Sequence, residues 1–152
     1  MPDLLVRLYR LPTPPPAPIN VLVRRAFSAE KHLVSCWIAE QFTAAWAGES
    51  EAAFARLPVS CFVAVEQEQL LGFACYDATA RSFFGPFGVA QSARGRGLGR
   101  ALLQAALADM SANGYGYAII GHATEIAFYR EAIDAIEIPD SDPGFYRGLL
   151  KQ

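Results

Sequence analysis

Residues 94–100 read RGRGLGR, which is the segment of the chain whose residue types point most directly to a chemistry. A run of strong helix formers follows, so we place the segment at a strand-to-helix turn, where the leading N–H groups of a helix have no intrahelical acceptor. Glycines at alternate positions let successive amides turn inward and form an anion nest: Gly95, Gly97 and Gly99. Three arginines add guanidinium groups suited to phosphate oxygens: Arg94, Arg96 and Arg100. Together with the helix dipole, the segment predicts binding of a phosphate or pyrophosphate group.

The glycine spacing separates this loop from two common nucleotide-binding motifs. Its third glycine comes one residue early for the Rossmann pattern G-x-G-x-x-G, and no Gly-Lys-Ser/Thr of a P-loop follows. Without further context, such a loop is also typical of a solvated turn. The strand-like segment before it, SFFGPFGV at residues 82–89, carries Gly85, Pro86 and Gly88, which a central strand tolerates poorly. We therefore expect a bulge or splay that leaves backbone groups unpaired near Phe87 and Val89.

A splayed strand beside an anion nest predicts an elongated ligand. Its pyrophosphate would lie in the nest, and an arm containing amides would pair with the free strand edge. Coenzyme A has this layout, with a pyrophosphate, a pantetheine arm with two amides and a terminal sulfur. The sequence therefore favours coenzyme A over other phosphate compounds.

The remaining elements follow from hydrophobic periodicity and turn residues. Pro12–Pro18 predicts a stiff extended connector rather than a PxxP ligand for an SH3-like partner. Ser28 is a candidate N-cap for the first helix and Thr124 for the last, while residues 66–69 form the turn of a hairpin. The expected strands are 4–11, 19–25, 60–65, 70–76, 82–89, 117–121, 135–138 and 145–149. The expected helices carry an apolar stripe over 33–46, then cover 51–57, 98–113 and 124–133.

From about Ile19 to Ile138 the sequence resembles the GNAT superfamily of acyl-CoA-dependent N-acyltransferases. The family signature Q/R-x-x-G-x-G/A fits residues 94–99, and the family phrase FYxxxGF is matched by Phe128 and Tyr129 but not by its Gly-Phe. The resemblance implies an α/β (α+β) fold with a mixed, mostly antiparallel central sheet flanked by helices, and acetyl-CoA as cosubstrate. It places pantetheine on the strand at Phe87, Gly88 and Val89. It places the pyrophosphate on the amides of Arg94, Gly95, Arg96, Gly97, Leu98, Gly99 and Arg100.

Acyl transfer from a thioester to an amine needs a neutral amine, an oxyanion donor and a proton for the leaving thiolate. A free N–H near Val89 could donate to the oxyanion, and the resemblance assigns the proton donor to Tyr129, whose alternative is a buried core aromatic. His122 is the candidate general base by chain position, but a surface or capping histidine is equally compatible with the pattern. Glu66 and Asp77 are further acids that could be simple solvated turn charges. A base is also unnecessary if the amine loses its proton to water.

Composition limits the class of protein. The chain has 152 residues, 53% of them hydrophobic, with 13 basic and 15 acidic side chains, so we expect one domain over 1–152 whose residues 1–18 form an N-terminal strand and connector. A formal charge of -2 gives no global attraction to nucleic acid or membrane, and no apolar run approaches the roughly 18 residues of a membrane span. We expect a cytoplasmic protein. The cysteines lack partner histidines at metal-ligand spacing, so we expect reduced, buried thiols and no metal: Cys36, Cys61 and Cys75.

The sequence thus predicts an N-acetyltransferase that moves an acetyl group from acetyl-CoA to a primary amine of a small molecule or peptide. The resemblance places the acceptor near the first helices and the hairpin, at residues that include Trp37, Phe42, Trp46 and Tyr76. One alternative is a non-catalytic acyl-CoA sensor, which would fit the absence of an acid in residues 82–89. Another is nucleic-acid contact by RGRGLGR, although one short basic cluster in an acidic chain provides little electrostatic attraction to nucleic acid. No nucleic-acid or membrane partner is expected, and the sequence allows a homodimer without requiring one.

Overall fold

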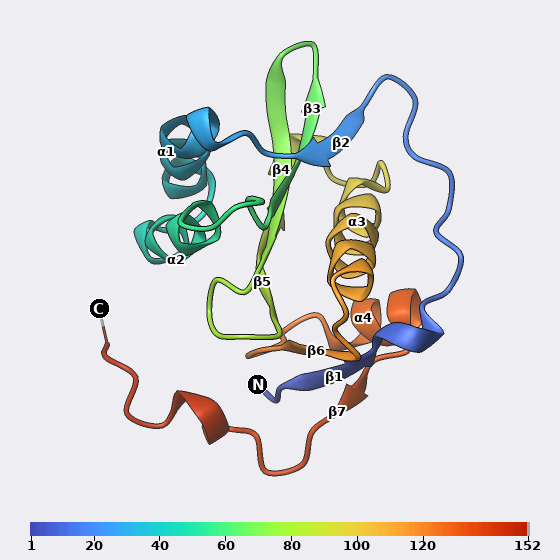
Figure 1. Ribbon diagram of the computed structural model, residues 1–152, viewed down its shortest axis with the longest axis vertical. Helices are drawn as coiled ribbons and strands as arrows, with labels where there is room; N and C mark the ends of the chain where they lie inside the picture. Colours follow the sequence, from blue (N-terminus) through green and yellow to red (C-terminus); the bar gives the residue numbers. More distant parts are fainter. Residues whose placement is uncertain (152) are drawn as a thin grey trace.

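The computed structural model describes residues 1–151 and contains one seven-stranded sheet with the order β2-β3-β4-β5-β6-β1-β7 (Figure 1). Among the described strands, the β5–β6 pair is parallel and every other neighbouring pair is antiparallel. The strands are β1 (Leu4–Arg7), β2 (Leu22–Arg25), β3 (Cys61–Glu66), β4 (Gln69–Tyr76), β5 (Phe83–Val89), β6 (Tyr117–Ile120) and β7 (Ile136–Glu137). The helices are α1 (Lys31–Gln41), α2 (Ala44–Phe54), α3 (Leu98–Ala112) and α4 (Ile126–Ile133). The predicted mixed, mostly antiparallel sheet with flanking helices is confirmed.

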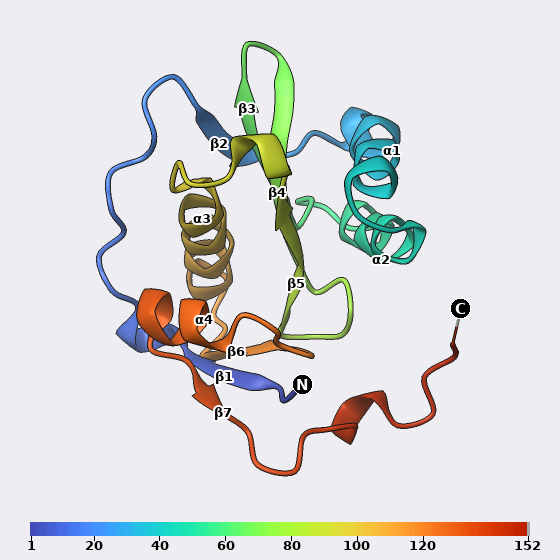
Figure 2. The ribbon, with the colours of Figure 1, turned by 180° about the vertical axis from the view of Figure 1, so that it is seen from behind.

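Helices cover both faces of the sheet. α1 and α2 lie on one face and α3 and α4 on the other, as Figure 2 shows from behind. Successive residues of β3 and β4 point to opposite faces, so Val63 and Phe73 join the core under α1 and α2, while Phe62 and Tyr76 join the core under α3. The near-continuous apolar composition of these strands follows from this burial on both sides.

The chain begins with a strand that lies inside the sheet. β1 pairs with β6 through Leu4–Ile120 and with β7 through Leu5–Ile136, so it separates two strands that are close together in the sequence. The strand itself was predicted, but its position was not. The strand predicted at residues 145–149 is wrong: the segment forms a 3-10 turn at Gly144–Tyr146, and the rings of Phe145 and Tyr146 pack on Phe83 instead of extending the sheet.

The first helical region differs from the expected one. The apolar stripe predicted over residues 33–46 is divided between α1 and α2, because the chain leaves the helix at Phe42 and the Thr43 hydroxyl accepts a hydrogen bond from the Trp46 amide at 3.1 Å. α2 therefore starts at Ala44, well before the short helix expected at residues 51–57. The N-caps expected at Ser28 and Thr124 are also wrong: α1 and α4 have Glu30 and Glu125 at these positions, without a side-chain cap bond.

Two elements that build the site agree with the sequence. The turn between β3 and β4 has Gln67 and Glu68 at φ 48° and 63°, the left-handed geometry of a tight hairpin turn. α3 starts at Leu98 and ends before Asn113, with Gly114 at φ 91° as its C-terminal stop.

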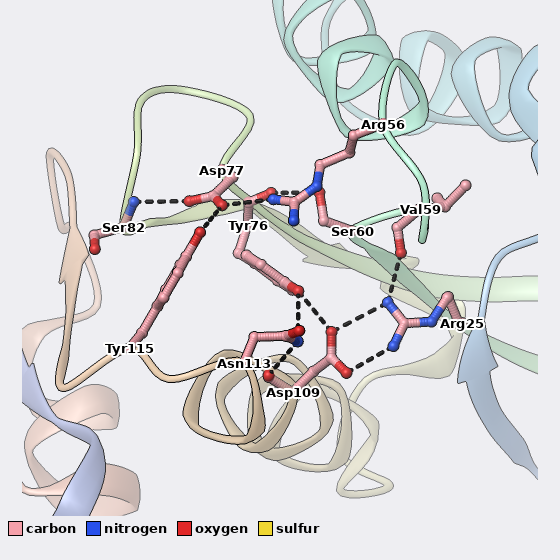
Figure 3. Close-up of polar contacts among 10 residues, drawn as sticks. All are labelled: Arg25, Arg56, Val59, Ser60, Tyr76, Asp77, Ser82, Asp109, Asn113 and Tyr115. Carbon is pink, nitrogen blue, oxygen red and sulfur yellow. Dashed lines mark hydrogen bonds and ion pairs between the residues drawn. The ribbon is translucent and has the colours of Figure 1, made fainter.

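A polar network fixes the C-terminal half of α3 against the sheet (Figure 3). Asp109 accepts hydrogen bonds from the Arg25 guanidinium at 2.6 and 3.1 Å and from the Tyr76 hydroxyl at 2.6 Å. The pKa of Asp109 is lowered, because these donors outweigh the effect of burial, which acts in the opposite direction. Asp77 forms a second group with Arg56, the Tyr115 hydroxyl and the Ser82 amide. The network holds α3 in one position, and the loop before α3 depends on that position.

Candidate active site

β5 separates from β6 after two residues. Phe83 and Phe84 pair with Ile119 and Ile120, and no later residue of β5 pairs with β6 in the described chain. On its other side β5 remains paired with β4, with a register shift between Ala74 and Tyr76. The segment with Gly85, Pro86 and Gly88 is therefore both irregular and open on one edge.

The free edge exposes the backbone of two residues. The Ala90 amide donates to the Leu71 carbonyl at 2.9 Å, so antiparallel alternation makes Gly88 the next residue that is hydrogen-bonded to β4. Phe87 and Val89 consequently direct their N–H and C=O groups away from β4, into the gap left by β6. These are the two positions at which the sequence predicted unpaired backbone groups.

The loop that follows forms a turn with two left-handed glycines. Gly95 and Gly97 have φ 80° and 79°, and Gly97 is the N-cap of α3 without any side-chain cap bond. The first amides of α3 are thus available to an acceptor from outside the helix. Gly99 behaves differently from expectation, because it has no positive φ and a Cβ there would make ordinary contact with Phe87 at 3.5 Å.

The three arginines of the loop have different environments. Arg94 Nε donates to the Val89 carbonyl at 3.3 Å. Arg96 forms a two-bond ion pair with Glu66, at 2.6 and 3.1 Å, and this pair lowers the pKa of the Glu66 carboxyl. Arg100 Nε is buried and has no hydrogen-bond partner among the described residues. The structure therefore directs Arg96 away from the gap, in contrast to the expectation that all three guanidinium groups face a phosphate.

A cavity of about 1290 Å³ extends from this loop to the far side of the splay. Its walls come from the corner between α1 and α2, from β5, from the N-terminus of α3, from the end of β6, from α4 and from the C-terminal segment. The predicted site residues that line it are Phe87, Gly88, Val89, Arg94, Gly95, Gly97, Leu98, Gly99, Arg100, His122 and Tyr129. Arg96 does not line it. The structure thus brings together residues that are more than forty positions apart in the sequence.

Tyr129 lies on α4 and is 8% exposed. Its ring contacts Phe128 and Phe87, with centroids at 5.2 and 6.4 Å. Burial, and then the charge of Glu125, raise the pKa of Tyr129 well above its usual range. The side chain is therefore a protonated phenol at neutral pH.

His122 follows β6 and is anchored through its backbone. It has φ 47°, and its amide donates to Asp3 Oδ1 at 3.0 Å, so the N-terminal strand holds this turn. Its ring lies against Tyr146, with centroids 3.8 Å apart. The imidazole borders the cavity with one face covered by the C-terminal segment.

Several cavity residues were not predicted as site residues, among them Glu49 on α2, Glu125 before α4 and Tyr146 near the C-terminus. The acids considered from the sequence, Glu66 and Asp77, are engaged by Arg96 and Arg56 and do not line the cavity. The signal for Glu49 would have been its helical spacing of three from Trp46, which places both on one side of α2.

A sequence profile of the acetyltransferase (GNAT) family matches residues 26–134. The chain belongs to this family. The match covers the region from the end of β2 to the end of α4, which contains the splay, the glycine loop and Tyr129. The resemblance stated from the sequence is confirmed.

Solved structures of GNAT proteins share the fold. A GCN5-related N-acetyltransferase from Sphaerobacter thermophilus superimposes on 90% of this chain with TM-score 0.68 at 19% identity. GNAT structures from Brucella melitensis with acetyl-CoA and from Escherichia coli with CoA align at 18% and 21% identity, with TM-scores 0.59 and 0.53. They cover 73% and 68% of this chain, which in turn spans 80% and 62% of them but only 48% of the Sphaerobacter protein. No curated protein sequence matches the chain significantly.

Acetyl-CoA is the cosubstrate of GNAT enzymes, and the cavity of this GNAT domain suits its parts. A pyrophosphate fits the free amides at the start of α3 and the unpartnered Arg100 Nε. Amide groups of a pantetheine arm fit the open edge of β5 at Phe87 and Val89. The residues present therefore fit the cosubstrate of the family.

Only some of the residues expected to contact the acceptor line the cavity. Phe42 and Trp46 line the cavity, whereas Trp37 packs in the core under α1 and α2, and the Tyr76 hydroxyl is used by Asp109. Of the cysteines, Cys61 and Cys75 are buried, and burial raises the pKa of the Cys75 thiol, but Cys36 is exposed, contrary to expectation.

Across residues 1–151, no group of three or more His, Cys, Asp or Glu side chains is placed to hold a metal ion. None of the helices in this part of the chain has the length and apolar character to cross a membrane.

Proposed function

We propose that this GNAT protein transfers an acetyl group from acetyl-CoA to a primary amine. The observation that carries the proposal is one continuous cavity in which the open edge of β5 and the free amides of α3 lead toward the Tyr129 phenol. Coenzyme A bound with its pyrophosphate at α3 would extend its arm along β5, and its thioester would lie between β5 and α4.

Backbone groups of β5 would polarise the thioester. The Val89 amide points into the gap, and a fixed N–H in a water-poor site stabilises the negative charge that develops on the thioester oxygen. Because this donor belongs to a strand still paired with β4, it needs no reorganisation during the reaction.

Tyr129 would protonate the departing thiolate. Its raised pKa keeps the proton on the phenol at neutral pH, so the hydroxyl can donate a hydrogen bond to the sulfur and pass its proton to it as the C–S bond breaks. His122 borders the same cavity and would accept the proton that the amine loses. An acceptor that binds as an ammonium ion first loses one proton to water, because only the neutral amine attacks. The C–N bond then forms as the C–S bond breaks, one proton passes from the amine nitrogen to His122 and one passes from Tyr129 to sulfur. Proton exchange with water afterwards returns His122 and Tyr129 to their starting forms.

The experiment is release of free thiol from acetyl-CoA with a panel of amines, combined with mass detection of the acetylated product. Thiol release that depends on an amine, with a product heavier by one acetyl group, is the expected result. Tight acetyl-CoA binding without release by any amine would contradict the proposal and favour a non-catalytic acyl-CoA sensor.

A further inference from the structure

One end of the cavity contains a carboxylate that the steps above do not use. Glu49 lies on α2, and the Thr79 hydroxyl, from the loop between β4 and β5, donates a hydrogen bond to its Oε1 atom. Across residues 1–151 no lysine or arginine forms an ion pair with Glu49. A partly buried carboxylate held in place without a cation is a site for a cationic ligand.

The C-terminal segment brings a second group to this end. Tyr146 packs so closely on the turn after β6 that a Cβ at Gly121 would overlap its hydroxyl, and its ring lies against His122. Burial, and then the charges of Asp3 and Glu49, raise the pKa of Tyr146 to about 12. Glu49 and Tyr146 line the same cavity, although the two come from distant parts of the chain. In Figure 1 the C-terminal segment turns toward the side of the sheet that carries α2.

Aromatic rings form the wall between Glu49 and β5. The centroids of Phe42 and Trp46 are 5.2 Å apart, and both residues line the cavity. Phe42 lies directly on β5, because a Cβ at Gly88 would come within 2.5 Å of its Cζ atom. The apolar surface thus begins beside the strand edge proposed for pantetheine and ends near the carboxylate.

The arginines of the cavity lie elsewhere. Within the described lining, the arginines are Arg94 and Arg100, which belong to the loop and first turn of α3. An acceptor carboxylate near Glu49 would therefore meet like charge without a guanidinium to offset it, which is costly in a partly dry site.

We propose that Glu49 binds the ammonium group of the acceptor, and that the acceptor is an arylalkyl primary amine with no carboxylate beside the amine. This assignment rests on the proposed acetyl transfer. Phe42 and Trp46 contact the aryl group, Thr79 keeps one oxygen of Glu49 occupied, and the other oxygen receives the ammonium. Amino acids are rejected by repulsion between carboxylates, and polyamines because their second charge has no partner on the aromatic wall.

Three amines test the substrate class by thiol release: 2-phenylethylamine, L-phenylalanine and spermidine. The first shares its aryl and amine groups with the second, which adds only a carboxylate. We expect kcat/KM for 2-phenylethylamine to exceed that for each of the other two by at least about tenfold, because an unpaired charge is excluded more strongly than a change of shape.

The Glu49→Gln variant tests the residue, and Glu51→Gln is its matched control on the same helix, where Glu51 is exposed and bonded to Ser35. Glu49→Gln should lower kcat/KM for 2-phenylethylamine at least about tenfold, mainly through KM, and should reduce the discrimination against phenylalanine, since a charge-assisted bond is lost. Acetyl-CoA affinity and Tm should be unchanged. Glu51→Gln should match the wild type.

The outcomes separate the two proposals. Thiol release that is fastest with spermidine or phenylalanine, or unchanged kinetics in Glu49→Gln, would overturn the assignment and leave acetyl transfer standing. If Glu49→Gln lowers both the Tm and the affinity for acetyl-CoA, Glu49 has a structural role, and the assignment of the acceptor ammonium to Glu49 is overturned as well. If no amine releases thiol while acetyl-CoA binds, acetyl transfer itself fails and the acceptor assignment fails with it.

Discussion

Replacing Tyr129 by phenylalanine removes one hydroxyl from the cavity and leaves the ring in place. The ring is almost fully buried against Phe87 and Phe128, so the packing that holds α4 is kept. Burial and the charge of Glu125, not a hydrogen bond, set the environment of the Tyr129 hydroxyl, so the free energy of unfolding should change by less than about 1 kcal/mol. For a chain of this length, that corresponds to a Tm shift of less than about 4 °C.

The effect on turnover should be much larger. A positioned general acid contributes roughly 10²- to 10⁴-fold, and the raised pKa of Tyr129 makes it a weak acid, so we expect the lower end of that range. The kcat of Tyr129→Phe should fall about 100-fold, which is about 2.7 kcal/mol in the activation free energy. Acetyl-CoA affinity should not change, because the phenol acts on sulfur only as it departs.

The assay is thiol release under saturating amine, with acetyl-CoA affinity measured separately by calorimetry. Tyr117→Phe is a suitable control, since Tyr117 lies on β6, is 49% exposed and does not line the cavity. A kcat for Tyr129→Phe within about threefold of the wild type would remove Tyr129 from the mechanism, because a general acid cannot contribute so little.

Three further predictions concern the loop, the polar network and alkaline pH. Gly97→Val should weaken acetyl-CoA binding at least about tenfold, because valine is strained by about 1–2 kcal/mol at φ 79° and its side chain enters the cavity, whereas Gly116→Val should bind normally by calorimetry. Asp109→Asn weakens the charge-assisted bonds from Arg25 and Tyr76 and should lower stability by about 2 kcal/mol, seen as a loss of about 6 °C in Tm; an unchanged Tm would show that the network contributes nothing. The pKa of Tyr76 is raised to about 12 in the folded protein, so the unfolded state releases this proton first and stability should fall as pH rises from about 10 to 12. Denaturant midpoints that stay constant over that interval would contradict the last prediction.

The sequence predicted the elements whose signals are local. The hairpin between β3 and β4 and the limits of α3 are encoded by neighbouring residues, namely a polar turn and a helix stop at Asn113 and Gly114. The splay of β5 was predictable because Gly85, Pro86 and Gly88 disrupt a strand within its own sequence. Nine of the ten residues proposed for coenzyme binding line the cavity, because they form two short runs beside that splay.

The wrong predictions concern features that depend on tertiary contacts between distant parts of the chain. Nothing within residues 4–7 shows that they pair with both β6 and β7. The apolar residues at 145–149 were predicted to form a strand, but Phe145 and Tyr146 pack on Phe83 from a 3-10 turn. The Arg96 side chain was predicted to face the phosphate because of its place in the motif. It forms an ion pair with Glu66, thirty residues away, and lies outside the cavity. Glu49 was missed because its place in the cavity depends on how α2 packs on the sheet, which no local pattern in the sequence encodes. A sequence motif thus located the coenzyme side of the site, but not the acceptor side.

Calorimetric binding of acetyl-CoA tests the central claim most directly, with ATP and NADH as ligands that share its phosphates but lack pantetheine. If the free edge of β5 and the amides of α3 bind the two parts of coenzyme A together, acetyl-CoA should bind at least about tenfold more tightly than either control, a difference of about 1.4 kcal/mol. Equal affinities for all three ligands would mean that the loop is a general anion site, and would contradict the assignment of the splayed strand to pantetheine.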